Sequence, residues 1–413
     1  MKILMCNSFY YYRGGSERYM FDLSKLLEEH GHEVIPFSME HKDNLPSKYS
    51  SFFVSHIDYP ALLKSKPGLR EIIRAFEKLI FSGEAKQKIK RLILETKPDI
   101  AHIQGIGHEI SPSILNVIKS FHIPIVQTLH DYGALCPNTS FLSRGEVCER
   151  CKGRRYYNVV LRRCKRDSLG ASLLAGFSQY VNMLTNVYGR NVDVYISPSR
   201  FLEKKFIEHG MKTKIINIPN FINLGEYQLR ESNSGYCLFA GRLIAIKGVN
   251  TLIEAAKLNR QSKILIAGDG ELAEEVRKAI AEHHLDNVTL LGFVEPKELM
   301  RFMSSANFMV FPSEWYENYP MSIIESFACG KPVIASNIGA LPDLVIDGRT
   351  GLLFKTGDAV QLGNKIQYLF EHPAEAEEMG KNGHEFALAN NDPESHYRQV
   401  MQVYQSLLNS SLN

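Results

Sequence analysis

Two glutamates, Glu317 and Glu325, have the spacing that most directly indicates chemistry. They stand eight positions apart in the segment PSEWYENYPMSIIESFACGKPVIAS, residues 312–336, which reads as a short helix leading into a buried strand. Eight residues slightly exceed two helical turns, so both carboxylates can face one site if the first precedes the helix. Carboxylates accept hydrogen bonds from hydroxyl groups, which indicates a ligand with two hydroxylated parts.

The start of this helix predicts an anion site between the two carboxylates. We expect Pro320 at the first helical position, where its missing N–H is not needed. The N–H groups of Met321 and Ser322 would then point out of the helix start toward an anion. Glu325 can accept hydroxyls of a ribose, and Glu317 those of a second ring beyond a diphosphate. The arrangement therefore suits a nucleotide sugar.

A basic pair, Arg242 and Lys247, follows an earlier predicted strand in the segment GRLIAIKG. The arginine offers a bidentate fork and the lysine a point charge, and the flanking glycines allow close backbone approach. Together these features can hold a diphosphate. The same pattern also fits a strand-to-helix turn whose two cations are merely solvated.

Two further groups follow predicted strands in the first half of the chain. Gly14 and Gly15 lie between a strand and a helix, where a tight turn or a closely approaching ligand favours glycine. His130 and Asp131 follow the strand IVQTL, where a histidine can be structural or can act on a substrate. Ligands of doubly wound sheets bind beyond the carboxyl ends of the strands, so we expect these groups to share a cleft.

The elements that must position these residues alternate between short strands and longer helices, in two consecutive sets. This alternation predicts an α/β fold with two Rossmann-like, doubly wound domains that face each other across a cleft. We place the first domain at residues 1–225, with a cysteine-containing insertion at about 132–190, and the second at 234–392. A final helix at 393–413 is expected to pack back on the first domain. The predicted strands are residues 2–7, 32–38, 99–104, 124–130, 193–199 and 215–219, then 236–242, 263–270, 288–293, 307–313, 332–336 and 351–354.

The composition is that of an ordinary soluble globular chain. The 48 basic residues exceed the 45 acidic ones by only three, which argues against a dedicated nucleic-acid-binding protein. The segment MKILMCNSFYYYRGG has too short an apolar run for a signal peptide and reads as a first strand. We therefore expect a cytoplasmic protein.

In this order, the segments GRLIAIKG, GDGE, GFVEPKELMRFMSSANFMVFPS and EWYENYPMSIIESFACGKPVIAS resemble the retaining nucleotide-sugar glycosyltransferases of family 4. That family has the GT-B fold of two Rossmann-like domains. Glu317 and Glu325 match its glutamate-x7-glutamate motif, and the resemblance extends over essentially the whole chain.

The resemblance implies how the donor is held. The basic pair would bind the donor diphosphate, Glu325 the ribose and Glu317 the transferred sugar. The base would face the backbone at Phe293 and Val294. We expect a UDP-sugar rather than a GDP-sugar as donor, and no catalytic metal.

The resemblance also assigns roles to the first half of the chain. Gly14 and Gly15 would allow close approach of the donor phosphate and the acceptor. His130 would touch the transferred sugar, with Asp131 in the same site. No residue stands out as a nucleophile, so we expect attack on the same face of the sugar through an ion-pair-like transition state.

One departure from the family pattern follows the first glutamate. Many members carry phenylalanine–glycine there, whereas this chain has Asn318, Tyr319 and Pro320. Since proline cannot donate a hydrogen bond, the phosphate contact must move to Met321 and Ser322. The preferred sugar therefore cannot be carried over from those relatives.

Four of the seven cysteines form the pattern C-x11-C-x2-C-x12-C at Cys136, Cys148, Cys151 and Cys164. In a cytosolic enzyme this pattern indicates a tetrahedral structural metal site, most simply zinc. Disulfides or free thiols are the alternatives, and a reducing cytosol disfavours disulfides. The other three cysteines lie in or beside apolar runs and are expected in the core: Cys6, Cys237 and Cys329.

The cysteine-containing insertion is basic and is followed by an uncharged segment at 168–189. We interpret that segment as an amphipathic helix with a core-facing stripe and not as a membrane span. The basic run indicates an anionic acceptor, such as a lipid diphosphate, and peripheral contact with the inner face of a membrane. The stripe comprises Leu169, Leu173, Phe177, Tyr180, Leu184 and Tyr188. The basic residues are Lys152, Arg154, Arg155, Arg162, Arg163, Lys165 and Arg166.

Taken together, these features predict a retaining glycosyltransferase that moves a hexose-type sugar from a nucleoside diphosphate to a glycan or lipid-linked acceptor. Such an activity would serve cell-surface polysaccharide or glycolipid biosynthesis. A sugar-nucleotide epimerase of the same architecture is one alternative, which product analysis without an acceptor would separate. A non-catalytic nucleotide-sugar-binding scaffold is the other, and the intact His130 and both glutamates disfavour it.

Overall fold

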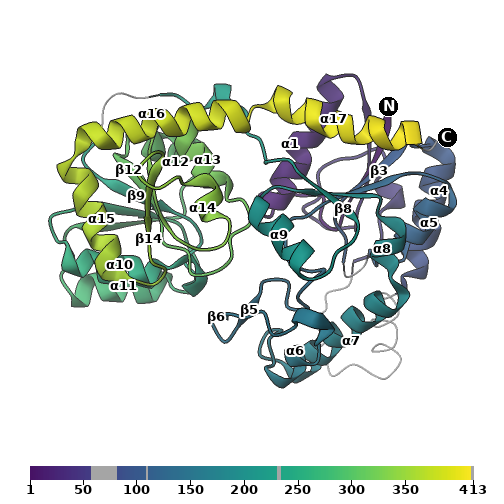
Figure 1. The fold of residues 1–413 in the computed structure, drawn as a ribbon, viewed down its shortest axis with the longest axis horizontal. Helices are drawn as coiled ribbons and strands as arrows, with labels where there is room; N and C mark the ends of the chain where they lie inside the picture. Colours follow the sequence, from purple (N-terminus) through teal and green to yellow (C-terminus); the bar gives the residue numbers. More distant parts are fainter. Residues whose placement is uncertain (57–80, 108–109, 230–233, 411–413) are drawn as a thin grey trace.

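Two parallel six-stranded sheets, each flanked by helices, form the frame of the molecule (Figure 1). The computed structural model describes residues 1–56, 81–107, 110–229 and 234–410. The first sheet has the order β2-β1-β3-β4-β7-β8 and the second β11-β10-β9-β12-β13-β14. The first contains β1 (Lys2–Asn7), β2 (Glu33–Phe37), β3 (Ile100–Gly105), β4 (Ile125–Thr128), β7 (Val194–Ser197) and β8 (Lys214–Asn217). The second contains β9 (Cys237–Ala240), β10 (Ile264–Ala267), β11 (Val288–Gly292), β12 (Phe308–Phe311), β13 (Val333–Ser336) and β14 (Gly351–Phe354).

The helices cover both sheets and close their apolar faces. The first half contains α1 (Gly15–Glu29), α4 (Gly83–Thr96), α5 (Ile114–Ser120), α6 (Asn158–Leu161), α7 (Leu169–Thr185), α8 (Val187–Asn191) and α9 (Arg200–Glu208). The second half contains α10 (Val249–Leu258), α11 (Ala273–Glu282), α12 (Pro296–Ser305), α13 (Met321–Ala328), α14 (Leu341–Leu344), α15 (Ala359–Glu371), α16 (Pro373–Asn390) and α17 (Pro393–Ser410). Each predicted strand has its counterpart, and the predicted α/β fold with two doubly wound domains is confirmed.

The second sheet has the 3-2-1-4-5-6 strand order of a dinucleotide-binding fold. The first has the other common doubly wound order, 2-1-3-4-5, extended by one strand, so each sheet has one point where the order reverses. That point lies between β1 and β3 in the first sheet and between β9 and β12 in the second. Crevices form at such points, beyond the carboxyl ends of the strands. The loops that follow β1, β4, β9 and β12 are therefore the segments that the topology places beside a ligand.

The chain passes between the two domains twice, once after β8 and once between α16 and α17 (Figure 1). The two passages are bonded to each other. The Ile222 amide donates to the Asn391 carbonyl at 3.2 Å, and Asn391 Nδ2 donates to the Asn220 carbonyl at 2.6 Å. Beyond this point α17 lies across the first domain.

Buried polar contacts fix α17 on the first domain. Tyr404 is fully buried, and its hydroxyl lies 2.6 Å from His102 Nδ1. His396 Nε2 lies 3.0 Å from the Tyr19 hydroxyl, and its Nδ1 donates to the Pro219 carbonyl at 2.8 Å. Burial lowers the pKa of His102 to about 3 and that of His396 to about 4. Both imidazoles are therefore neutral at pH 7. The last three residues of the predicted final helix, 411–413, lie outside the described residues.

The insertion between β4 and β7 contains a small antiparallel hairpin, β5 (Leu142–Ser143) and β6 (Glu146–Val147), which the sequence did not predict. It continues through α6 and α7. The prediction that α7 buries its bulky stripe is wrong. The single predicted helix is broken at Asn186, so the last stripe residue, Tyr188, lies in α8. Tyr180 and Tyr188 are half-buried, and the other four stripe residues are exposed: Leu169, Leu173, Phe177 and Leu184. No helix in the described part of the chain combines the length and apolar character needed to cross a bilayer.

We expect the unfolding free energy to fall as the pH is lowered from 7 to 5, in part because His102 and His396 titrate. Their folded pKa values lie below the unfolded value of about 6.5, so the unfolded chain binds more protons in this range. Each histidine contributes a slope of up to about 1.4 kcal/mol per pH unit. Urea unfolding of His396→Gln should show a smaller loss between pH 7 and pH 5 than the parent. An exposed histidine, His372, provides the matched control as His372→Gln. Equal losses in the parent and both variants would contradict the assignment.

Candidate functional site

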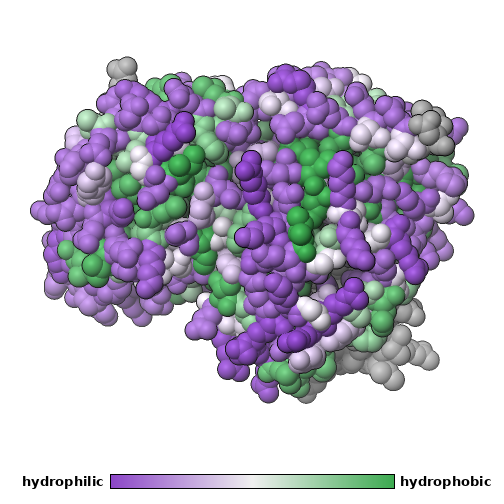
Figure 2. Space-filling model, in the orientation of Figure 1, coloured by the Kyte–Doolittle hydropathy of each residue, from purple (hydrophilic) through white to green (hydrophobic). Residues whose placement is uncertain are grey.

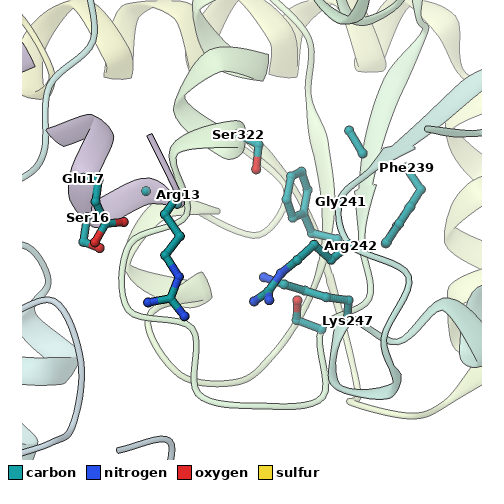
Figure 3. Close-up of a pocket in the computed structure, with 13 residues that line it drawn as sticks. Arg13, Ser16, Glu17, Phe239, Gly241, Arg242, Lys247 and Ser322 are labelled. Carbon is teal, nitrogen blue, oxygen red and sulfur yellow. The ribbon is translucent and has the colours of Figure 1, made fainter. Parts of the chain in front are cut away.

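A cavity of about 470 Å³ lies between the start of α1 and the strand-end loops of the second sheet (Figure 3). Its volume is in the range of small-molecule sites. The first domain contributes Arg13, Gly14, Gly15, Ser16 and Glu17, and the second Phe239, Ala240, Gly241, Arg242, Lys247, Phe311, Ser313 and Ser322. The predicted glycine pair, the predicted basic pair and Ser322 are thus brought together at one place.

Three cations, Arg13, Arg242 and Lys247, line the cavity together with one carboxylate, that of Glu17. Arg13 extends from the first domain toward the space that Arg242 and Lys247 face from the second (Figure 3). Arg13 and Arg242 are exposed, and the Arg13 guanidinium lies 4.2 Å from the centre of the Phe9 ring. Neither arginine forms an ion pair with another described residue. Their hydrogen-bond donors therefore remain available to a phosphate-bearing ligand.

The Lys247 ammonium faces the cavity but also neutralises Glu317. Its Nζ lies 2.6 Å from Glu317 Oε1, which also accepts from Ser313 Oγ at 2.7 Å. Glu317 is only 5% exposed. Burial alone would raise the pKa of Glu317, but the charge of Lys247 and the hydrogen bonds from Lys247 and Ser313 lower it below its ordinary value. Glu317 is therefore an anion beside the cavity.

The start of α13 differs by one residue from the prediction. Pro320 is the residue before the helix, with a ψ of 116°, and Met321 is the first helical residue, so the placement of Pro320 at the first helical position is wrong. The Pro320 carbonyl accepts from the Ile323 amide at 3.2 Å, which leaves the two preceding amides outside the helical hydrogen bonds. Of these two residues, Ser322 lines the cavity, whereas the Met321 side chain is buried.

Glu325, the second glutamate of the pair, is held from both domains. Arg18 of α1 forms a short ion pair with its Oε1 through Nη1, and the Tyr227 hydroxyl donates to the same oxygen at 3.1 Å. Arg18 Nη2 also donates to the Tyr227 hydroxyl at 3.2 Å. Among the described residues none donates to Glu325 Oε2. That oxygen can accept from a ligand hydroxyl while the contact between the domains is kept.

The loop that carries Glu317 also packs against the first domain and is hydrogen-bonded to it. Tyr316 packs its ring 4.9 Å from that of Phe201, and its hydroxyl donates to Glu149 Oε1 at 2.9 Å. Asn318 Nδ2 donates to the Leu129 carbonyl at 3.1 Å. The departure from the family pattern at position 318 therefore has a physical role, because it ties the Glu317 loop to the end of β4.

His130 lies two residues beyond the end of β4 and is neutral. Its Nε2 lies 2.7 Å from Gln104 Oε1, and Gln104 Nε2 points to Met5 Sδ at 3.3 Å. The amide oxygen of Gln104 thus faces the imidazole, which places the proton on Nε2 and leaves Nδ1 as an acceptor. Loss of hydration lowers the pKa of His130 to about 4. The imidazole packs edge-on against Tyr19 of α1 at 5.3 Å.

Asp131 is turned back onto its own loop. The Gly133 amide donates to Asp131 Oδ1 at 2.8 Å. Desolvation raises the pKa of Asp131, and the Gly133 amide and the Lys165 ammonium oppose this rise. Asp131 therefore interacts with the insertion, and neither it nor His130 lines the cavity.

The glycine pair has no conformational or packing reason of its own. Gly14 is extended, with φ −166° and ψ −167°, and Gly15 is the first residue of α1. A Cβ on Gly15 would meet no atom within 4 Å, and one on Gly14 would meet only Glu17 Oε2 at 3.6 Å. The space beside these two cavity-lining glycines is therefore open, and it leaves room for a ligand to approach the backbone closely.

Some functional candidates were missed, and others lie outside the cavity. Arg13, Ser16 and Glu17 flank the glycine pair in RGGSER, so their position at the start of α1 was the signal that could have found them. Phe293 and Val294 do not line the cavity. Phe293 is 72% exposed, just after β11.

The four cysteines of the insertion come close together without forming disulfides. Burial raises the pKa of Cys136 and that of Cys151, the latter to about 12, and the other cysteines of the group raise both further. In the described ranges, however, no three His, Cys, Asp or Glu side chains are arranged to hold a metal ion. The structural zinc stays a prediction, which metal analysis of the purified protein can test. The remaining cysteines are buried as expected: Cys6, Cys237 and Cys329.

Comparison with protein families places both halves of the chain. The family described as glycosyltransferase family 4 matches residues 13–226, and that described as glycosyl transferases group 1 matches residues 226–386. The chain is 34% identical to a D-inositol 3-phosphate glycosyltransferase of Pseudarthrobacter chlorophenolicus, over 89% of this chain and 84% of that one. It is 26% identical to an uncharacterized glycosyltransferase of Methanocaldococcus jannaschii, over 94% and 93% of the two chains.

Solved structures share the whole fold. Sucrose-phosphate synthase from Thermosynechococcus elongatus superposes with a TM-score of 0.71 at 22% identity, over 99% of both chains. HepE from Anabaena in complex with UDP and glucose superposes with a TM-score of 0.69 at 19% identity, over 98% of this chain and 100% of that one. These likenesses confirm the predicted GT-B fold.

We expect Gly15→Ala to fold normally but to bind a nucleotide sugar at least tenfold more weakly. Alanine at a first helical position costs the fold nothing and can stabilise it by up to about 1 kcal/mol. The added methyl group, however, would occupy the cavity wall. Calorimetric titration and thermal unfolding measure the two effects separately.

Gly83→Ala is the matched control, because Gly83 is the first residue of α4 and a Cβ there also meets nothing within 4 Å. The control should keep wild-type affinity. Wild-type affinity in Gly15→Ala as well would remove the glycine pair from the binding site.

Proposed function

This chain belongs to the family 4 glycosyltransferases, and we propose that it moves a hexose-type sugar from a nucleoside diphosphate to a glycan or lipid-linked acceptor with retention of configuration. The product would serve cell-surface polysaccharide or glycolipid biosynthesis. The observation that carries the proposal is the cavity where the open α1 start meets Arg242, Lys247 and Ser322. Cations from two domains and an unencumbered helix start suit a diphosphate.

The donor would lie across the switch point of the second sheet. Its diphosphate would contact the three cations and the free amides at the start of α13. The ribose would donate to Glu325 Oε2, and the transferred sugar would lie toward Glu317 and His130. A uridine base is our choice because HepE, which has the same fold, was solved with UDP and with UDP-glucose.

Transfer would proceed on one face of the sugar. The bond between the anomeric carbon and the phosphate oxygen breaks, and its electron pair stays with the diphosphate. The acceptor hydroxyl attacks the same face, and its proton passes to the departing phosphate oxygen. Arg13, Arg242 and Lys247 stabilise the charge that develops on the diphosphate. The Nδ1 of neutral His130 accepts a hydrogen bond from a sugar hydroxyl, and this bond orients the reacting ring.

Titration with UDP, GDP and their hexose conjugates tests the donor assignment. Glu325→Gln should weaken free UDP and UDP-sugar alike, by roughly ten- to a hundredfold, since a hydrogen bond to a charged group contributes about 1.5–3 kcal/mol. Glu317→Gln should weaken ligands that carry the sugar but not free UDP, because the Lys247 ammonium that loses its carboxylate partner stays available to the diphosphate. Glu314→Gln is the matched control, because Glu314 Oε1 accepts from the Thr251 hydroxyl and Glu314 does not line the cavity. Equal loss of free UDP affinity in both variants would refute this division.

His130→Ala should reduce turnover at least tenfold while donor affinity changes little, because its partner is the reacting sugar and not the diphosphate. With a pKa of about 4, His130 should add no step to the rate profile between pH 5.5 and pH 8. Steady-state kinetics and calorimetry separate these effects. His122→Asn, at the opposite end of the same strand, is the control. Wild-type turnover in His130→Ala would end the assignment.

A further inference from the structure

Helix α7 packs in the opposite way from a helix of an ordinary soluble domain. Its seventeen residues include no charged side chain, and only Ser172 and Gly176 are buried. Four of its large apolar residues keep about half or more of their surface exposed. Leu173 is 52% exposed, Phe177 51% and Leu184 75%. A helix that buries its small residues and exposes its large ones is incomplete without a further apolar surface.

Helix α6 packs against the small residues of α7. Its own apolar side chains enlarge the exposed apolar surface. A Cβ on Gly176 would lie 3.1 Å from Val159 Cγ1, so the two helices are in close contact there. Tyr157 is 51% exposed and Leu161 70%. Apolar surface is visible over α6 and along the outer end of α7 (Figure 2). We call this surface the α6–α7 face, comprising Tyr157, Leu161, Leu169, Leu173, Phe177 and Leu184.

Basic residues adjoin this face along the chain. None of the arginines between η2 (Lys152–Arg154) and α7 forms an ion pair with another described residue, and no acidic residue lies from 152 to 166. Three of them stand within five positions just before α7: Arg162, Arg163 and Arg166. An uncharged apolar helix beside clustered arginines is the pattern of a surface that inserts its large side chains among lipids while the arginines meet anionic head groups.

We propose that the α6–α7 face docks on a bilayer containing anionic lipids. Helix α7 would lie in the plane of the membrane, along about 25 Å of its surface. A second copy of the chain fits less well, because a twofold contact through this face would bring the two arginine clusters toward each other. The unpaired arginines instead match a negatively charged partner.

The same face lies directly behind the candidate catalytic loop. Gln179 of α7 donates to the Ala134 carbonyl at 2.8 Å, and Lys165 lies close enough to Asp131 to affect its pKa. Docking through α7 therefore sets the loop after His130 beside the membrane surface. On the premise of the proposed function, this geometry selects a membrane-embedded, lipid-linked acceptor over a free glycan.

Flotation with vesicles tests the docking without donor or acceptor. The full chain should float with vesicles of phosphatidylcholine and phosphatidylglycerol, and at least tenfold less with phosphatidylcholine alone or in 0.5 M salt. Replacing Leu173, Phe177 and Leu184 together by serine should reduce binding to anionic vesicles at least tenfold. Replacing Arg162, Arg163 and Arg166 by glutamine should do the same and remove the salt dependence.

A matched control carries serine at three equally exposed apolar positions of the second domain, Leu258, Val360 and Leu388. It should bind vesicles as the parent does, and all variants should keep UDP affinity. Vesicle binding that is absent in the parent, or unchanged in the α7 variant, would overturn the proposal. So would a parent dimer that the α7 variant converts to monomer in light scattering, because the face would then join two copies. Failure to transfer sugar with vesicle binding intact would count against the proposed function alone.

Discussion

A carboxylate buried as deeply as that of Glu317 needs a permanent counter-charge, and Lys247 supplies it from across the switch point of the second sheet. This ion pair ties the turn after β9 to the loop after β12. It also requires a close approach of backbones. Gly248 has φ +70°, and a Cβ there would lie 1.8 Å from the Pro312 carbonyl. The ion pair, Gly248 and the cavity wall therefore depend on one another. Loss of the Lys247 charge or of the Glu317 charge would leave the other charge without its partner.

The first domain acts on the same loop from the opposite side. Tyr316 and Asn318 flank Glu317, and both are bound by groups of the first domain. Asn318 reaches the Leu129 carbonyl, one residue before His130. Glu317 and His130 are thus linked through their hydrogen-bonded neighbours Asn318 and Leu129. Their relative position depends on how the domains meet and not on either domain alone.

The sequence was sufficient for the parts of the molecule that local rules govern. Strand patterns predicted both sheets. The rule that ligands bind beyond strand ends predicted a shared cleft, and in the structure the glycine pair and the basic pair line one cavity. The individual side-chain contacts between the domains could not be predicted from the sequence. Arg18 and Glu325 are 307 positions apart, and no local pattern relates them. The prediction of a buried face failed for α7. The spacing of its large apolar residues shows that one face of the helix is apolar, but it does not show whether another element covers that face.

The two passages of the chain between the domains have a mechanical consequence. Because Ile222 and Asn220 are hydrogen-bonded to Asn391, the two covalent connections between the domains lie side by side. Asn391 Nδ2 also lies 2.8 Å from the hydroxyl of Tyr319, two residues from Glu317. One asparagine side chain therefore holds both a segment that connects the domains and the loop of Glu317, so the position of that loop depends on the connection as well as on its own domain.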